Sequence, residues 1–220
     1  MRLALLLAVV LSAFAANSLL NRAALAGGLI GPTAFALVRL IAGAAMLAAL
    51  SLARGRAPAR PAGRAVPALL LALYVLGFSL AYLRLDAGLG ALILFGGVQI
   101  TMFAAAVIGG ARPPLRRWIG AAVALGGLAW LTAPAGGGVD PLAALLMLAA
   151  AVGWGLYSMT GFAGGDATAN SATNFALAAV PALGLWLLLP AEAPATAGGL
   201  ALAVVSGAVT SGLAYALWFA

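Results

Sequence analysis

Polar side chains inside long apolar runs are the residues of this 220-residue sequence best suited to bind a ligand. A guanidinium or amide surrounded by hydrocarbon is costly, so it needs a partner or a function. Arg39 lies six residues into such a run, where it predicts attraction of an anionic or carboxylate-bearing substrate into an outer vestibule. The alternatives are that its long stem snorkels to the membrane surface, or that it pairs with Asp86.

Amide side chains in the apolar runs suit a neutral or zwitterionic ligand, because they offer both donors and acceptors. Gln99 lies in the middle of a run with Thr101 beside it, and an interhelical hydrogen bond is the alternative role. Asn17 and Asn21 are four residues apart and therefore share one helix face. We expect Asn17 to face a cavity and Asn21 to meet water among the headgroups.

Aromatic residues form a further group, whose rings either line a passage and stack on planar substrates or belong to an interfacial belt. We assign Tyr82 to the belt, because it lies near the end of its run. Trp154 and Tyr215 lie deeper and are cavity candidates. The candidate substrate-binding residues are Asn17, Arg39, Gln99, Thr101, Trp154, Tyr157, Ser158 and Tyr215.

The composition excludes a soluble domain and most catalytic chemistry. Apolar residues make up 65% of the chain and charged residues 7%, against about a quarter in soluble domains. The sequence contains no His, Cys or Lys, which excludes zinc sites, thiol or imidazole catalysis, a Walker P-loop and a Schiff base. The sequence therefore predicts neither an enzyme nor a bound metal or cofactor.

The elements that carry these residues are expected to be transmembrane helices, each of about 20 apolar residues. A secretory signal is the alternative for the first run, which has a small-residue motif near its end. The approximate spans are 3–20, 33–53, 65–83, 87–109, 118–133, 141–159, 171–189 and 198–220.

The arginines predict the orientation in the membrane. Counting loops alternately places eight arginines on the N-terminal side and two, Arg22 and Arg84, on the other. Positive loops face the cytoplasm, so we expect a multi-pass protein of the cell (inner) membrane with a cytoplasmic N-terminus. The net charge of +7 is thereby explained without nucleic acid. The expected partners are the lipid bilayer and a small-molecule substrate, with a homodimer as a possible assembly.

An internal repeat relates the two parts of the chain. The segment 33–37 recurs at 173–177, and Leu80-Ala-Tyr82 recurs as Leu213-Ala-Tyr215. Spans one to three then correspond to spans six to eight, so the unit has five spans and its second copy is inverted, as in alternating-access transporters. We expect repeats at 1–133 and 141–220, joined by the glycine-rich segment 134–141. The second copy is incomplete, which predicts a ten-span fold truncated at its C-terminus.

The order of several motifs resembles EamA-like members of the drug/metabolite transporter superfamily. This resemblance implies a secondary transporter that exports a small metabolite or drug-like compound; the alternative is a truncated or accessory membrane protein without transport activity. The chain departs from the family at Ala111, where the usual residue is acidic. The motifs are Asn17-Ser-Leu-Leu-Asn-Arg22, Gly31-Pro-Thr33, Phe35-Ala-Leu-Val-Arg39, Gly90-Ala-Leu-Ile-Leu-Phe-Gly-Gly-Val-Gln-Ile-Thr-Met102, Gly109-Gly-Ala-Arg-Pro113 and Val152-Gly-Trp-Gly-Leu-Tyr-Ser158.

Overall fold

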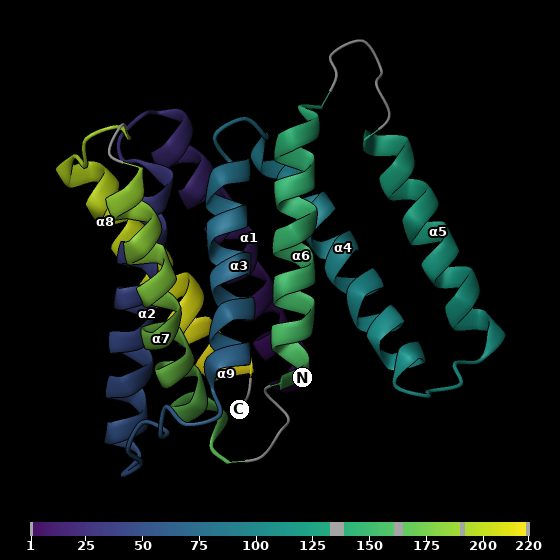
Figure 1. Ribbon diagram of the computed structural model, residues 1–220. Helices are drawn as coiled ribbons and strands as arrows, with labels where there is room; N and C mark the ends of the chain where they lie inside the picture. Colours follow the sequence, from purple (N-terminus) through teal and green to yellow (C-terminus); the bar gives the residue numbers. More distant parts are fainter. Residues whose placement is uncertain (1, 133–138, 161–164, 190–191, 219–220) are drawn as a thin grey trace.

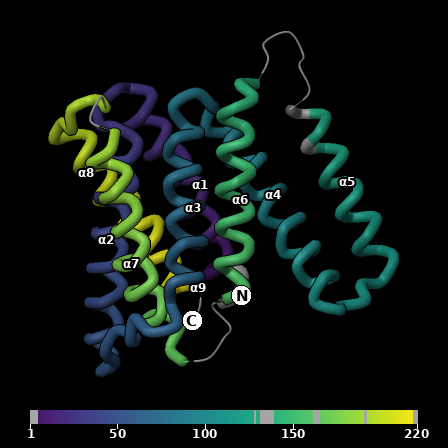
Figure 2. The backbone as a smooth tube through the Cα atoms, in the orientation of Figure 1, coloured from purple at the N-terminus to yellow at the C-terminus, as the bar shows by residue number. Residues whose placement is uncertain are grey.

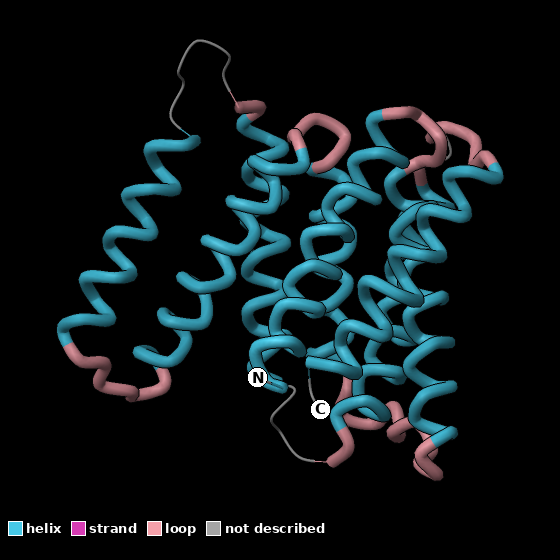
Figure 3. Tube along the Cα trace, turned by 180° about the vertical axis from the view of Figure 1, so that it is seen from behind, coloured by secondary structure: helices cyan, strands magenta, loops and turns pink. Residues whose placement is uncertain are grey.

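The computed structural model of the chain describes residues 2–132, 139–160, 165–189 and 192–218, and this part contains helices and no strand (Figure 3). Six of its helical stretches are long and apolar enough to cross a membrane. The chain is therefore an all-helical integral membrane protein. Its elements are α1 (Arg2–Ala26), α2 (Pro32–Ala53), α3 (Ala65–Ala81), α4 (Ala87–Ile108), α5 (Leu115–Thr132), α6 (Pro141–Thr160), α7 (Ala167–Leu188), α8 (Ala197–Gly207), the π-helical segment η1 (Ala208–Leu213) and α9 (Ala214–Trp218).

Each apolar run predicted from the sequence coincides with a helical stretch, but local capping moves the ends. Helix α1 continues six residues farther than predicted, because the turn that ends it requires Gly28, whose φ is +62°. Helix α7 begins four residues earlier than predicted, because the carboxylate of Asp166 accepts the N–H of Ala169 at 2.8 Å. The glycine-rich joint at 134–141 lies mostly outside the described residues.

The last predicted span is not one regular helix. Helix α8 passes into the π-helical segment η1, which holds one residue more per turn, and then into the short helix α9. Hydropathy has no signal for this change, because the residues of all three pieces are apolar or small. Segments of this kind inside α-helices are frequent at functional sites.

The helices form a bundle from which α5 stands apart (Figures 1 and 2). Helix α2 packs along α7, α3 packs along α6, and α1 packs against α8 and α9. Helix α5 has its main contact with α4. The start of α1 and the end of α9 lie at the same end of the bundle (Figure 2).

Glycines let the packed helices approach closely. A Cβ on Gly153 would lie 2.7 Å from the carbonyl oxygen of Leu70 and 2.9 Å from the nitrogen of Tyr74. A Cβ on Gly77 would lie 2.8 Å from the carbonyl oxygen of Leu146. Helices α3 and α6 therefore meet backbone to backbone, the contact that small residues permit in membranes.

One end of the bundle, here called the acidic end, carries Asp86, Asp140 and Glu192. The Glu192 carboxylate accepts the N–H of Thr33 at 3.1 Å and the N–H of Ala34 at 3.3 Å. These N–H groups have no intrahelical partner at the start of α2, so the carboxylate satisfies them and interacts favourably with the helix dipole.

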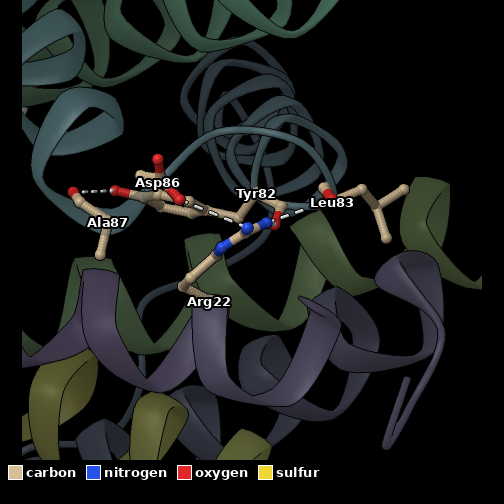
Figure 4. A network of polar contacts seen from close by, with 5 residues as sticks. All are labelled: Arg22, Tyr82, Leu83, Asp86 and Ala87. Atoms are coloured by element: carbon tan, nitrogen blue, oxygen red, sulfur yellow. Dashed lines mark hydrogen bonds and ion pairs between the residues drawn. The ribbon is translucent and has the colours of Figure 1, made fainter. Parts of the chain in front are cut away.

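Arginine side chains also join the loops of the acidic end. Arg22 donates to the carbonyls of Tyr82 and Leu83 at 3.0 and 3.2 Å, and it pairs with Asp86 at 3.4 Å (Figure 4). Arg84 pairs with Asp140 at 2.7 Å. The ends of α1 and α3 are thus tied to the start of α4, and the α3–α4 loop is tied to the start of α6.

The opposite end, here called the arginine-rich end, carries the loops 54–64 and 109–114. Arg54 donates to Thr168 at 3.2 Å, and Arg56 pairs with Asp166 at 3.0 Å. The α2–α3 loop and the start of α7 therefore lie at the same end of the bundle, as the alternating loop arrangement predicts.

The close approach of α3 and α6 predicts a position-specific effect of a single methyl group. Gly153→Ala places a Cβ against backbone atoms, so we expect it to lower the free energy of unfolding by about 1–3 kcal/mol. Gly126→Ala is the matched control, because a Cβ there meets no other atom and alanine favours the helix. Thermal melting of the detergent-solubilised proteins measures both, and equal melting temperatures for the two variants would contradict the packing.

The ion pair between the α3–α4 loop and the residue before α6, Arg84–Asp140, predicts a pH dependence. The pKa of Asp140 lies below its ordinary value because the N–H of Ala143 and the guanidinium of Arg84 bind its carboxylate. The unfolded carboxyl has the higher pKa, so this stabilisation is complete above that value and is lost as the pH falls through the folded pKa.

Asp140→Ala should therefore lower the melting temperature at neutral pH, and the difference should shrink in acid. Melting curves of both proteins from about pH 7 to about pH 3 cover the ordinary pKa of an aspartate. A difference that stays constant over this range would show that the carboxylate charge contributes nothing.

Candidate functional site

The deepest charge in the described bundle is Arg39, whose side chain is among the largest that are fully buried. The residue is 1% exposed. Its Nη2 donates to the hydroxyl of Tyr74 at 2.8 Å, and its Nε donates to the hydroxyl of Ser211 at 3.0 Å. Helices α2 and α3 and the segment η1 thus surround one guanidinium.

Ring faces and an unused donor complete the surroundings of Arg39. The guanidinium carbon lies 5.2 Å from the ring centre of Tyr74 and 5.1 Å from that of Phe78, distances at which a cation is attracted to the ring. Its buried Nη1 has no hydrogen-bond partner among the described residues. The three ion pairs of the described chain all lie at the two ends, so this buried cation has no counter-ion.

The sequence-based expectations for Arg39 need correction. Its side chain does not snorkel to the surface, because it is enclosed by the bundle. It does not pair with Asp86, which pairs with Arg22 instead (Figure 4). Nor does it line an open outer vestibule. The side of α2 that carries Arg39 faces α3 and η1. Hydropathy alone does not predict which side of a helix faces its neighbours.

Two glycines allow η1 to reach Arg39. A Cβ on Gly207 would run into the backbone carbonyl of Arg39, and a Cβ on Gly43 would lie 3.2 Å from the carbonyl oxygen of Gly207. Helices α2 and α8 therefore cross in backbone contact at the main chain of Arg39. This crossing brings Ser211, one turn farther along the chain, within hydrogen-bond distance.

A second group of buried polar side chains surrounds Asn17. Its Oδ1 accepts hydrogen bonds from the hydroxyls of Ser206 at 2.6 Å and Thr210 at 3.0 Å. The Nδ2 of Asn21 donates to the backbone carbonyl of Asn17 at 3.0 Å, and the hydroxyl of Ser79 donates to Asn21 at 3.4 Å. Helices α1, α3 and α8 and the segment η1 thus share one polar network.

The expectations for Asn21 and Tyr82 were wrong. Asn21 does not meet headgroup water, because α1 continues beyond the predicted span and the residue is fully buried. Tyr82 is not a belt residue: it is fully buried, packs edge-on against Phe78 at 4.6 Å between ring centres, and donates to the carbonyl of Ala87 at 3.3 Å. Both residues lie near helix ends that face protein rather than lipid.

Aromatic rings line the other side of Tyr74. Trp154 stacks on Tyr74 with 5.3 Å between ring centres and an interplanar angle of 18°. Phe14 meets Trp154 edge-on at 5.2 Å and Tyr215 at 6.2 Å. Tyr157 lies 6.0 Å from Tyr215. Rings from α1, α3, α6 and α9 thereby form one cluster that begins at the guanidinium.

The structure brings together five of the eight predicted site residues and leaves three apart. The hydroxyl of Thr101 donates to the carbonyl of Gly97 and that of Ser158 to the carbonyl of Trp154, so each bonds within its own helix. Gln99 is exposed beside α5. The residues that gather are Asn17, Arg39, Trp154, Tyr157 and Tyr215.

Sequence reasoning missed Tyr74 and the hydroxyl residues of α8 and η1. Tyr74 was detectable, since its hydroxyl lies in the middle of an apolar run. Ser206, Thr210 and Ser211 were less so, because small hydroxyl residues also occur at ordinary helix contacts. The resulting site offers a cation, hydroxyl groups and ring faces, which suit an anionic group attached to an apolar or planar body.

Comparisons with known proteins support the architecture. No model of a known protein family matches the sequence. An uncharacterized protein of Pseudomonas aeruginosa, PA1977, is 45% identical over 221 aligned positions, which cover 99% of this chain and 76% of the relative. A solved structure described only as a crystal structure of a protein superposes with a TM-score of 0.64 at 25% identity, over 96% of this chain and 77% of the other.

The network around Asn17 predicts a measurable contribution to stability. Asn17→Ala removes the acceptor of two buried hydroxyls, so we expect it to lower the free energy of unfolding by about 1 kcal/mol. Ser12→Ala is the matched control, because Ser12 is an exposed polar residue of the same helix. Thermal melting in detergent compares them, and the network is refuted by an Asn17→Ala protein as stable as the Ser12→Ala protein.

Proposed function

This chain belongs to the family of the Pseudomonas aeruginosa protein PA1977, and we propose that it is a secondary transporter, similar to EamA-like exporters, that moves a small molecule outward by alternating access. The substrate binds in the polar interior described above. Its anionic group, such as a carboxylate, binds Arg39, and its body lies against the rings that begin at Tyr74.

The observation that carries this proposal is the buried guanidinium without a counter-ion. An unpaired charge in a membrane interior costs several kcal/mol, and such residues mark substrate or ion pathways by default. The unused Nη1 of Arg39 adds a donor that none of the described residues satisfies. A carboxylate would supply both the missing charge and the missing acceptor, because arginine binds it through two parallel hydrogen bonds.

The arrangement of the helices is consistent with an inverted repeat. An inverted repeat makes α1, α2 and α3 equivalent to α6, α7 and α8, so each contact should have an equivalent partner contact. The contact of α1 with α8 is then equivalent to that of α6 with α3. The contact of α2 with α8 is likewise equivalent to that of α7 with α3, and all four contacts occur. Thr33 lies at the acidic end beside Glu192, whereas its repeat mate Thr173 donates to Ala59 at the arginine-rich end. Repeats of opposite orientation place the substrate between them near the midplane.

The contacts at the two ends suit alternate opening. Arg22–Asp86 and Arg84–Asp140 join helices at the acidic end, and Arg56–Asp166 joins them at the arginine-rich end. Ion pairs with exposed partners contribute little to stability, because water and salt screen them. Breaking one set while keeping the other therefore costs little, as a transporter that opens to each side in turn requires.

The proposal predicts that Arg39→Gln loses transport while keeping its fold. Reconstituted wild-type and variant proteins are compared by counterflow with carboxylate-bearing substrates, such as amino acids, and with uncharged nucleosides. We expect counterflow of the responding carboxylate to fall at least about thirtyfold, the equivalent of about 2 kcal/mol for a lost buried charge contact. Arg60→Gln is the control, because it removes the same charge from an exposed loop position.

Melting temperatures separate a binding role from a structural one. Arg39→Gln removes an uncompensated buried charge, so we expect its melting temperature to equal or exceed that of the wild type. Unchanged carboxylate counterflow in Arg39→Gln would refute the proposed binding role. Loss of transport together with loss of the folded protein would show that Arg39 is required for structure instead.

A further inference from the structure

A pocket at the arginine-rich end, outside the polar interior, lies between α4 and α5. It has a volume of about 440 Å³, and its polar lining consists of Gln99, Arg112, Arg116 and Arg117. Phe103 forms part of its apolar lining. Three cations therefore line a cavity at the arginine-rich end of the bundle.

These three arginines differ from those of the α2–α3 loop. Arg54, Arg56 and Arg64 each bind a residue of the segment 166–170. The guanidinium groups of Arg112, Arg116 and Arg117, by contrast, make no hydrogen bond or ion pair with the described residues. Three of the four acids lie at the acidic end, and the fourth, Asp166, already pairs with Arg56. The positive charge of this pocket is therefore left for a partner from outside the chain.

The pocket continues into an apolar groove along the same pair of helices. A neighbouring cavity of about 340 Å³ shares Gln99, Phe103 and Arg117 with the first and extends between Ile100 and Ala124. Helix α5 has its main contact with α4. No third helix of the described chain therefore packs over the groove between them. Its position, with cations at one end and apolar side chains beyond them, matches a molecule with an anionic head and a hydrocarbon tail.

We infer that the seam between α4 and α5 binds an anionic phospholipid. The headgroup phosphate contacts Arg112, Arg116 and Arg117, and an acyl chain lies along Ile100 and Ala124. Guanidinium groups suit this role because they bind phosphate oxygens through paired hydrogen bonds. Basic pockets between transmembrane helices on the cytoplasmic side are known sites for anionic lipid headgroups. The inference does not depend on the proposed transport activity.

Native mass spectrometry of the full chain in detergent tests this site. The protein is titrated with phosphatidylglycerol, with phosphatidylcholine of the same acyl chains, and with inorganic phosphate. We expect phosphatidylglycerol to bind more tightly than phosphatidylcholine and to resist displacement by phosphate. Each arginine near an anionic lipid contributes about fivefold, so the Arg112→Gln, Arg116→Gln, Arg117→Gln triple variant should bind phosphatidylglycerol about a hundredfold more weakly.

A matched pair of single variants keeps the test decisive if the triple variant does not fold. Arg116→Gln should weaken phosphatidylglycerol binding about fivefold, whereas Arg60→Gln, which removes the same charge from another exposed position of the same end, should leave it unchanged. Equal losses in the two single variants would overturn the site, because they would indicate general attraction to positive charge. Equal affinity for the two lipids would overturn the headgroup assignment, and displacement by phosphate would identify a free-anion site instead.

Quenching of Trp118 fluorescence gives an independent measure of where the lipid lies. Trp118 packs edge-on against Phe103 at 5.0 Å between ring centres, and Phe103 lines both cavities. Brominated phosphatidylglycerol should therefore quench part of the emission, and Trp118→Phe should remove that quenchable part. Identical quenching in the wild type and in Trp118→Phe would place the lipid elsewhere and overturn the proposed seam.

Discussion

The attraction and desolvation of one guanidinium govern the interior of this protein. Arg39 is held by two hydroxyl groups and two ring faces, which offset part of the cost of burying its charge. That arrangement requires η1 to lie against α2, and the glycines at their crossing make the approach sterically possible. The aromatic cluster starts at Tyr74 for the same reason, since Trp154 stacks on the ring that faces the cation. One buried charge thus contacts the π-helical segment, α3 and the first ring of the aromatic cluster.

The two ends of the bundle use charge in different ways. At the acidic end, carboxylates satisfy helix N-termini and arginines, so its polar groups are largely neutralised within the protein. At the other end the arginines outnumber their acidic partners, and Arg112, Arg116 and Arg117 remain available to the surroundings. The end with unpaired arginines is the end that the loop charges predict to face the cytoplasm. A binding surface and a topological signal can thus reside in the same residues.

The sequence predicted the helices well and their rotation poorly. Long apolar runs separated by glycine, proline and arginine leave little choice of helix position, so capping by Gly28 and Asp166 accounts for the main differences. Which face of a helix meets protein is a different matter, because lipid and protein interior are similarly apolar. Asn21 and Tyr82 were placed by their distance from the run ends, and both are buried. Gln99, chosen for its polarity, faces the seam beside α5 instead.

The π-helical segment η1 determines which residues of α9 face the bundle. A single added residue advances a helix by roughly 100° about its axis, so α9 is turned relative to a regular continuation of α8. Tyr215 consequently reaches the rings of Phe14, Tyr157 and Phe175. The rotation of α9 about its axis, and not the pattern of apolar residues in its sequence, thus determines which of its residues are buried. A homologous chain lacking one residue in 208–213 would present a different side of the helix that follows to the same neighbours.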